Sequence, residues 1–131
     1  MLFDTSGLYS FFDDDDFRRA DASAFIESAA IRLTTSYVLA EFIPLCQTRG
    51  LNRKKTLEFV EMLITNPLIE IVWVDENLHQ QASALLRKRL DKTYSLCDAV
   101  SFVVMREHGL TEALTTDKHF EQEGFIKLLQ S

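Results

Sequence analysis

The sequence predicts an α/β fold, a three-layer sandwich in which a mainly parallel sheet lies between helices. Two observations lead to this fold class. Short apolar runs alternate with longer amphipathic segments along the whole chain, and acidic residues directly follow two of the apolar runs. No internal repeat and no linker interrupts the pattern. With 131 residues, the chain is expected to form a single domain over residues 1–131.

The composition is that of a globular protein with a sizeable core. Hydrophobic residues make up 47% of the chain, and ten Phe stand against only four Gly and two Pro. No apolar run approaches the roughly 20 residues that span a bilayer. Cys46 and Cys97 lie in apolar surroundings, which is typical of reduced core cysteines. We therefore expect a cytoplasmic protein without a disulfide framework or a membrane contact.

The net charge of −6 argues against a protein that holds nucleic acid by bulk charge. Any contact with RNA would have to use local basic clusters or metal ions. Two basic clusters are present, at residues 53–55 and 87–92, and both are better explained as solvated helix faces than as tracks for RNA phosphates.

In the first half of the chain, strands are predicted at residues 1–3 and 31–34. Helical segments are predicted at residues 7–12 (a short helix or turn), 18–30 and 37–49, and from a cap at Asn52 to Asn66. Thr35 or Ser36 can cap the third helix, and Gly50 can close it. Pro44 inside that helix removes the hydrogen bond to the carbonyl of Ala40. The four aspartates 13–16 are predicted to form a solvated loop rather than a cation site.

In the second half, strands are predicted at residues 69–74 and 113–116, and a last short strand at 124–129. Helices are predicted at residues 75–90 and 95–105. Ser95 and Asp98 match a capping box at the start of the latter helix. This helix is apolar on nearly all sides, so we expect it to be enclosed by other elements.

Four acids are predicted to converge at one edge of the sheet. Asp4 and Asp117 follow strands, and the carboxyl ends of parallel strands share an edge. Asp98 lies in the first turn of its helix and Glu41 in the second turn of another, so both reach the same edge if their helices begin there. Each acid also has an explanation as a turn, rim or cap residue, but the occurrence of all four in one chain favours a site.

Carboxylates that approach each other repel, and a divalent cation relieves the repulsion. Oxygen ligands without an accompanying Cys or His cluster favour Mg²⁺ or Mn²⁺ over zinc. We expect His119 to be a packing or loop-ordering residue rather than a ligand. The acids therefore predict a site for Mg²⁺ or Mn²⁺.

Asp4-Thr5-Ser6, Tyr37–Glu41, Cys97–Phe102 and Thr115–Phe120 occur in this order over the whole chain. Together they resemble PIN-domain ribonucleases, and most closely the VapC-type toxins of bacterial toxin–antitoxin modules. The resemblance implies a Mg²⁺- or Mn²⁺-dependent endoribonuclease of RNA, usually a homodimer, that is silenced by a cognate antitoxin. One departure is Lys118, which stands where the family sometimes carries a second acid.

The activity that this resemblance implies is metal-assisted hydrolysis of a phosphodiester bond. Asp4 and Asp98 would be direct metal ligands, whereas Glu41 and Asp117 would bind metal through water or position the attacking water. Ser6 and Thr116 would support the ligating carboxylates by hydrogen bonds.

Two other classes of function are open at this stage. A PIN-like scaffold could be catalytically silent and bind RNA or protein. A phosphotransferase could use Asp4 as its nucleophile, but haloacid-dehalogenase-like phosphatases need a second Asp where Ser6 stands. Transfer RNA, ribosomal RNA and messenger RNA are all possible targets of a nuclease.

Overall fold

A five-stranded parallel sheet forms the centre of the computed structural model, which describes residues 1–131. The strand order is β3-β2-β1-β4-β5, and every pairing is parallel. The strands are β1 (Leu2–Phe3), β2 (Leu33–Thr35), β3 (Glu70–Val72), β4 (Glu112–Leu114) and β5 (Ile126–Lys127). The predicted parallel sheet is confirmed, and all strands end at the same edge.

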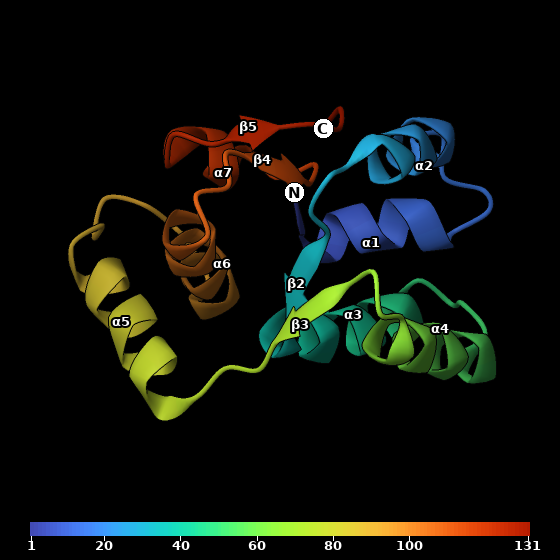
Figure 1. Ribbon diagram of the computed structural model, residues 1–131, viewed down its shortest axis with the longest axis horizontal. Coiled ribbons are helices and arrows are strands. Elements are labelled where there is room, and N and C mark those ends of the chain that lie inside the picture. Colours follow the sequence, from blue (N-terminus) through green and yellow to red (C-terminus); the bar gives the residue numbers. More distant parts are fainter.

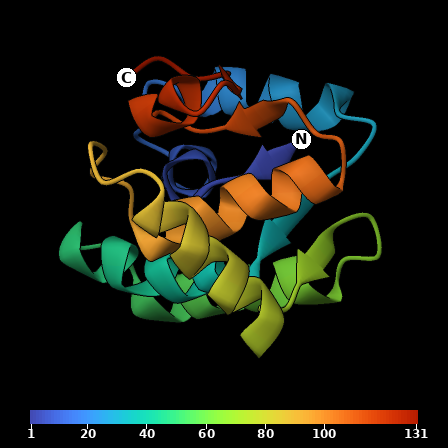
Figure 2. The same ribbon diagram turned by 90° about the vertical axis from the view of Figure 1, so that its left-hand side faces the viewer.

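Helices cover both faces of the sheet, which confirms the three-layer arrangement. Figure 1 shows α1–α4 on one side of the strands and α5 and α6 on the other. Figure 2 shows α5 crossing α6 on the second side. The helices are α1 (Thr5–Phe12), α2 (Arg19–Ser28), α3 (Ser36–Thr48), α4 (Arg53–Thr65), α5 (Glu76–Arg87), α6 (Leu96–Glu107) and α7 (Lys118–Gln122). None of these helices is long and apolar enough to pass through a bilayer.

The sheet separates two apolar cores, because successive side chains of a strand point to opposite faces. Leu2 packs into the core beneath α5 and α6, together with its register partners Leu33 and Ala113. Phe3 and its partner Leu114 pack into the core beneath α1–α4. Although β1 is only two residues long, its central position buries both of its side chains completely or nearly so.

The helix caps expected from the sequence are confirmed. Thr35, Asn52 and Asp75 each accept a hydrogen bond from a backbone N–H in the first turn of α3, α4 and α5. Ser95 and Asp98 form the complete capping box of α6. These caps fix where α3 and α6 begin, and therefore where Glu41 and Asp98 lie relative to the sheet.

Several strands are shorter than the sequence pattern predicts. The predicted strand 113–116 ends at Leu114, the strand 69–74 covers only Glu70–Val72, and the strand 124–129 covers only two residues. Helices begin directly after the two central strands, α1 at Thr5 and α3 at Ser36, so β1 and β2 offer few residues for pairing with β4 and β3. As a result, Thr115 and Thr116 belong to a loop beyond the end of the sheet.

Gly7 allows α1 to lie against this end of the sheet. A Cβ atom on Gly7 would overlap the carbonyl oxygen of Leu114. Only glycine therefore fits at this crossing of α1 and β4. The close approach brings Ser6 next to the loop that follows β4.

Candidate active site

The four acids expected from the sequence line one cleft at the carboxyl edge of the sheet. Asp4 follows β1, Asp117 lies beyond β4, Glu41 lies on α3 and Asp98 lies in the first turn of α6. The cleft has a volume of about 550 Å³, and only one of its twelve lining residues is hydrophobic. No lysine or arginine is among them. The cleft thus gathers four carboxylates, and His119 is the only basic side chain among its lining residues.

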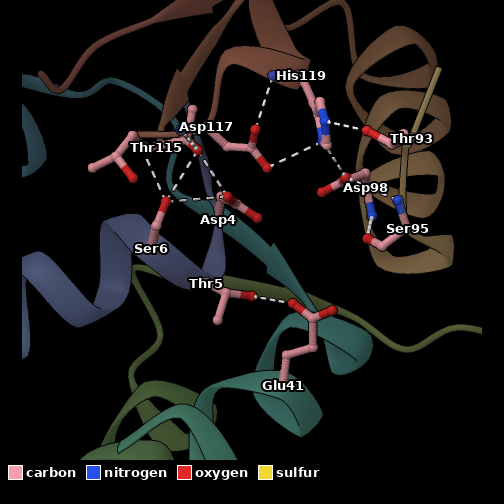
Figure 3. A network of polar contacts seen from close by, with 11 residues as sticks. Asp4, Thr5, Ser6, Glu41, Thr93, Ser95, Asp98, Thr115, Asp117 and His119 are labelled. Atoms are coloured by element: carbon pink, nitrogen blue, oxygen red, sulfur yellow. Dashed lines mark hydrogen bonds and ion pairs between the residues drawn. The ribbon is translucent and has the colours of Figure 1, made fainter. Parts of the chain in front are cut away.

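Asp4 is the most enclosed member of the group, with only 5% of its surface exposed. It occupies the cap position of α1, yet its side chain makes no capping hydrogen bond. Instead, Oδ2 accepts hydrogen bonds from Thr115 Oγ1 at 2.7 Å and from Ser6 Oγ at 3.3 Å (Figure 3). The Asp4 carboxylate is therefore oriented by Thr115 and Ser6 in the cleft and does not cap α1.

The pKa of the Asp4 carboxyl is raised to about 7, chiefly by burial and to a lesser extent by the negative charges of Asp98 and Asp117. The hydrogen bond from Thr115 opposes this shift because it stabilises the ionised form. A buried carboxyl with a raised pKa, surrounded by other carboxylates, is stabilised either by keeping its proton or by binding a cation.

A small hydrogen-bond network ties the loop after β4 to the start of α1. Ser6 Oγ lies 3.1 Å from Thr115 Oγ1 and accepts a hydrogen bond from the backbone N–H of Thr116 at 3.0 Å. The backbone N–H of Asp117 donates to Thr115 Oγ1, also at 3.0 Å. Ser6 thus contacts Asp4 directly, whereas Thr116 contributes through its backbone.

The closest side-chain support of Asp4 comes from Thr115, which sequence reasoning did not single out. The sequence position of Thr115 could have indicated this role, because Thr115 is the first residue after β4 and β4 is the parallel neighbour of β1. A hydroxyl at that position lies beside the end of β1.

Asp98, Asp117 and His119 form the second part of the site (Figure 3). His119 Nδ1 lies 3.0 Å from Asp98 Oδ2 and 3.4 Å from Asp117 Oδ2. Asp98 Oδ2 also accepts the backbone N–H of Ser95 at 3.0 Å, and Asp117 Oδ1 caps α7 by accepting the backbone N–H of His119. Capping therefore positions both carboxylates and leaves Asp98 Oδ1 without a hydrogen bond.

Glu41 lies on the opposite wall of the cleft. It is exposed, and its Oε1 accepts a hydrogen bond from Thr5 Oγ1 at 2.9 Å (Figure 3). Thr5 directly follows Asp4, so this contact couples α3 to the same strand end. Pro44 lies within α3 one turn further on and also lines the cleft.

The residues present fit a divalent cation. Possible ligand atoms of Asp98, Asp117 and His119 all lie within 4.8 Å of one another. Asp4 is close enough for its pKa to be raised by both Asp98 and Asp117. Carboxylates in this number, with no lysine or arginine among them, are the ligands that hard divalent ions take in proteins.

Residues 1–125 match the model of the PIN domain family, and the chain belongs to this family. The chain is 32% identical over 96 residues to the 23S rRNA-specific endonuclease VapC20 of Mycobacterium tuberculosis. These 96 aligned residues make up 73% of this chain and 72% of that protein. The expected resemblance to VapC-type PIN-domain ribonucleases is thus confirmed.

The solved structures agree with this assignment. The crystal structure of Mycobacterium tuberculosis VapC20, described as a sarcin–ricin loop cleaving toxin, superposes with a TM-score of 0.88 at 25% identity and covers 98% of both chains. FitAcB from Neisseria gonorrhoeae superposes with a TM-score of 0.64 at 20% identity, over 96% of this chain and 94% of that one. The second likeness supports the fold alone.

Proposed function

We propose that this protein is a VapC-type endoribonuclease toxin that requires Mg²⁺ or Mn²⁺ and acts as one PIN domain over residues 1–131. The observation that carries the proposal is the cleft itself: Asp4, Glu41, Asp98 and Asp117 come from four distant segments of the chain and line it together. A fold requires no such collection of acids, and a silent binding module would have no use for it. The metal would be held by these carboxylates, with Asp98 at the centre of the group.

A bound divalent ion would polarise the scissile phosphate and lower the pKa of a water molecule next to it. The residues of the chain supply the remaining functions. Asp4 is fixed by Thr115 and Ser6, and Asp98 by its capping box, so both carboxylates are oriented before substrate arrives. The Glu41 carboxylate, held by Thr5 on the facing wall, would orient the attacking water and accept its proton.

The experiment is RNA cleavage by the purified protein in EDTA and after Mg²⁺ or Mn²⁺ is restored. We expect EDTA to abolish cleavage and either ion to restore it. The variant Asp98→Asn should lose at least about a hundredfold in cleavage rate, as expected for a group that stabilises transition-state charge. Asp21→Asn is the matched control, because Asp21 is exposed on α2 and lines no part of the cleft. Cleavage that persists in EDTA would refute the metal requirement.

Ribosomal RNA is the proposed substrate class, because the relative that covers most of this chain is described as specific for 23S rRNA. A synthetic sarcin–ricin loop hairpin and a transfer RNA of similar size give the two arms of the test. We expect cuts in the hairpin at protein concentrations that leave the transfer RNA intact. The reverse preference would reassign the substrate while leaving the nuclease activity in place.

We further propose that the protein is cytoplasmic, forms a homodimer and is silenced by an antitoxin. An arginine of the antitoxin that enters the cleft would form charge-assisted hydrogen bonds with these carboxylates. Leu57 and Met62 of α4 are each 43% exposed, and such apolar residues could lie in a dimer interface. Light scattering on the isolated chain tests the dimer, and co-purification with the product of a neighbouring gene tests the antitoxin.

A further inference from the structure

One imidazole lies among the carboxylates of the cleft. His119 Nδ1 is 3.0 Å from Asp98 Oδ2 and 3.4 Å from Asp117 Oδ2, and possible ligand atoms of these three residues lie within 4.8 Å of one another. We propose that His119 is an additional metal ligand, and that it makes the centre prefer Mn²⁺ over Mg²⁺. The inference rests on the proposed metal dependence and assigns Asp117 a direct contact, where the sequence pattern favoured a water-mediated one.

The His119 ring is held by groups outside the proposed ligand set. Its Nε2 lies 3.1 Å from Thr93 Oγ1, and the ring packs edge-to-face with Tyr94 at a centroid distance of 5.3 Å. Only 17% of the side chain is exposed. Metal-binding histidines are usually oriented in this way, by a hydrogen bond on the ring nitrogen that faces away from the metal.

This orientation directs Nδ1 at two carboxylates. When the ring donates its Nε2 hydrogen to Thr93, Nδ1 carries a lone pair. In the other tautomer Nδ1 carries the hydrogen and donates it to Asp98 Oδ2, at the observed 3.0 Å. A cation bound among the three atoms would take the place of that hydrogen, because a metal-binding histidine offers a lone pair. The same three atoms that share a hydrogen bond in the metal-free protein are thus placed to share an ion.

The spacing of the three atoms suits a six-coordinate ion. Ligands about 2.1 Å from an octahedral ion lie about 3 Å from their neighbours, since adjacent bonds meet at right angles. The two observed separations from His119 Nδ1, 3.0 and 3.4 Å, are close to this value.

A nitrogen ligand changes which ion the site prefers. Mg²⁺ takes oxygen ligands almost exclusively and gives up its water reluctantly. First-row transition ions gain from nitrogen ligands, in an affinity series that begins with Mn²⁺. A set of two carboxylates and one imidazole should therefore bind Mn²⁺ more tightly than Mg²⁺, by a margin that depends on His119.

The experiment is pulsed electron paramagnetic resonance on the full chain loaded with one equivalent of Mn²⁺. We expect the spectrum to show coupling to a directly bound ¹⁴N nucleus. The variant His119→Asn, whose amide oxygen can take the place of Nδ1, should still bind Mn²⁺ but lose this coupling. The control is His108→Asn at the far end of α6, where the Nδ1 atom of His108 lies 2.9 Å from the carbonyl oxygen of Val104. The Mn²⁺-loaded control variant should show the same ¹⁴N coupling as the parent.

Isothermal titration calorimetry gives the second measurement, the affinities for Mn²⁺ and for Mg²⁺. The ratio of Mn²⁺ to Mg²⁺ affinity should fall about tenfold or more in His119→Asn and stay unchanged in His108→Asn, in line with the loss seen when a metal-site group is removed.

The outcomes separate this inference from the function on which it rests. Bound Mn²⁺ without nitrogen coupling in the parent would overturn the role of His119 and leave the metal-dependent nuclease intact. No bound Mn²⁺ at all would overturn both. Coupling that survives in His119→Asn would also overturn the assignment, because another nitrogen would then be the ligand.

Discussion

Replacing Asp4 with asparagine is expected to stabilise the metal-free protein at alkaline pH, although it should abolish activity. The Asp4 carboxyl has a pKa of about 7 in the folded protein because it is buried, against 3.8 for an unperturbed aspartate. Between pH 5 and pH 8 the folded state therefore binds more protons than the unfolded state. In that case the free energy of unfolding falls as the pH rises.

The magnitude follows from the pKa difference. From pH 5 to pH 7 the folded protein holds a proton that the unfolded chain has already released. Over these two pH units the free energy of unfolding falls by ~3 kcal/mol. The parent should lose this free energy of unfolding across the window, whereas Asp4→Asn has no group to ionise. The difference in stability between variant and parent should thus rise by ~3 kcal/mol from pH 5 to pH 8.

Urea unfolding followed by circular dichroism in EDTA measures this difference at the two pH values. Asp21→Asn serves as the control, because Asp21 is exposed on α2 and lies outside the cleft. In a parallel experiment without EDTA, free Mn²⁺ at about a hundred times its dissociation constant should stabilise the parent by about 2.7 kcal/mol and the Asp4 variant much less. A variant–parent difference that is constant from pH 5 to pH 8 would refute the reasoning.

Three further predictions concern the supports of the site. Thr115→Val removes the hydrogen bond that favours ionised Asp4, so the rise of Mn²⁺ affinity with pH, in which the ion displaces the Asp4 proton, should move about one unit to higher pH; an affinity profile identical to the parent would contradict this. Gly7→Ala should lower the free energy of unfolding by about 1–3 kcal/mol in urea, because the added methyl group meets the backbone of β4, and an unchanged midpoint would show that the crossing can relax. Glu123→Gln removes the ion pairs that the buried Glu123 carboxylate forms with the partly exposed Arg106 and Arg89, and should destabilise the protein by roughly 1–3 kcal/mol at neutral pH. Arginine contacts keep the pKa of Glu123 low, so the loss should shrink in thermal unfolding as the pH falls through that pKa and protonates the parent.

The sequence was sufficient for the fold class because its local signals agree with one another. Several helices have a recognisable start, as at Asn52 and Ser95, and the central strands β1 and β2 are buried on both faces. Strand lengths were overestimated because the number of paired residues depends on neighbouring strands. The starts of α1 at Thr5 and of α3 at Ser36 limit the number of residues that β4 and β3 can pair with, and no property of residues 69–74 indicates it.

The acids of the site could be predicted from their places at strand ends and helix starts, but their partners could not. Thr115 donates to Asp4 across 111 positions of the chain, and only the parallel pairing of β1 and β4 brings the two together. His119 belongs to a helix of five residues, too short to show a periodic pattern from which its direction could be inferred.

The charged segments outside the cleft agree with the simpler expectation. Lys54 and Lys55 are exposed on α4. Arg89 in the second basic cluster is paired with the buried Glu123 at 3.0 Å and therefore has a structural role. Of the four consecutive aspartates, Asp13 accepts a hydrogen bond from Tyr9. Contacts of this kind explain these residues without a ligand.

The most direct test of the central claim is anomalous diffraction at the manganese absorption edge from crystals soaked in MnCl₂. The account predicts a peak in the cleft, within bonding distance of a carboxylate oxygen of Asp98 and surrounded by Asp4 and Asp117. The peak should disappear in crystals of Asp98→Asn. Saturating Mn²⁺ that gives no peak in the cleft, or gives peaks only elsewhere on the molecule, would contradict the claim that these acids form a metal-dependent nuclease centre.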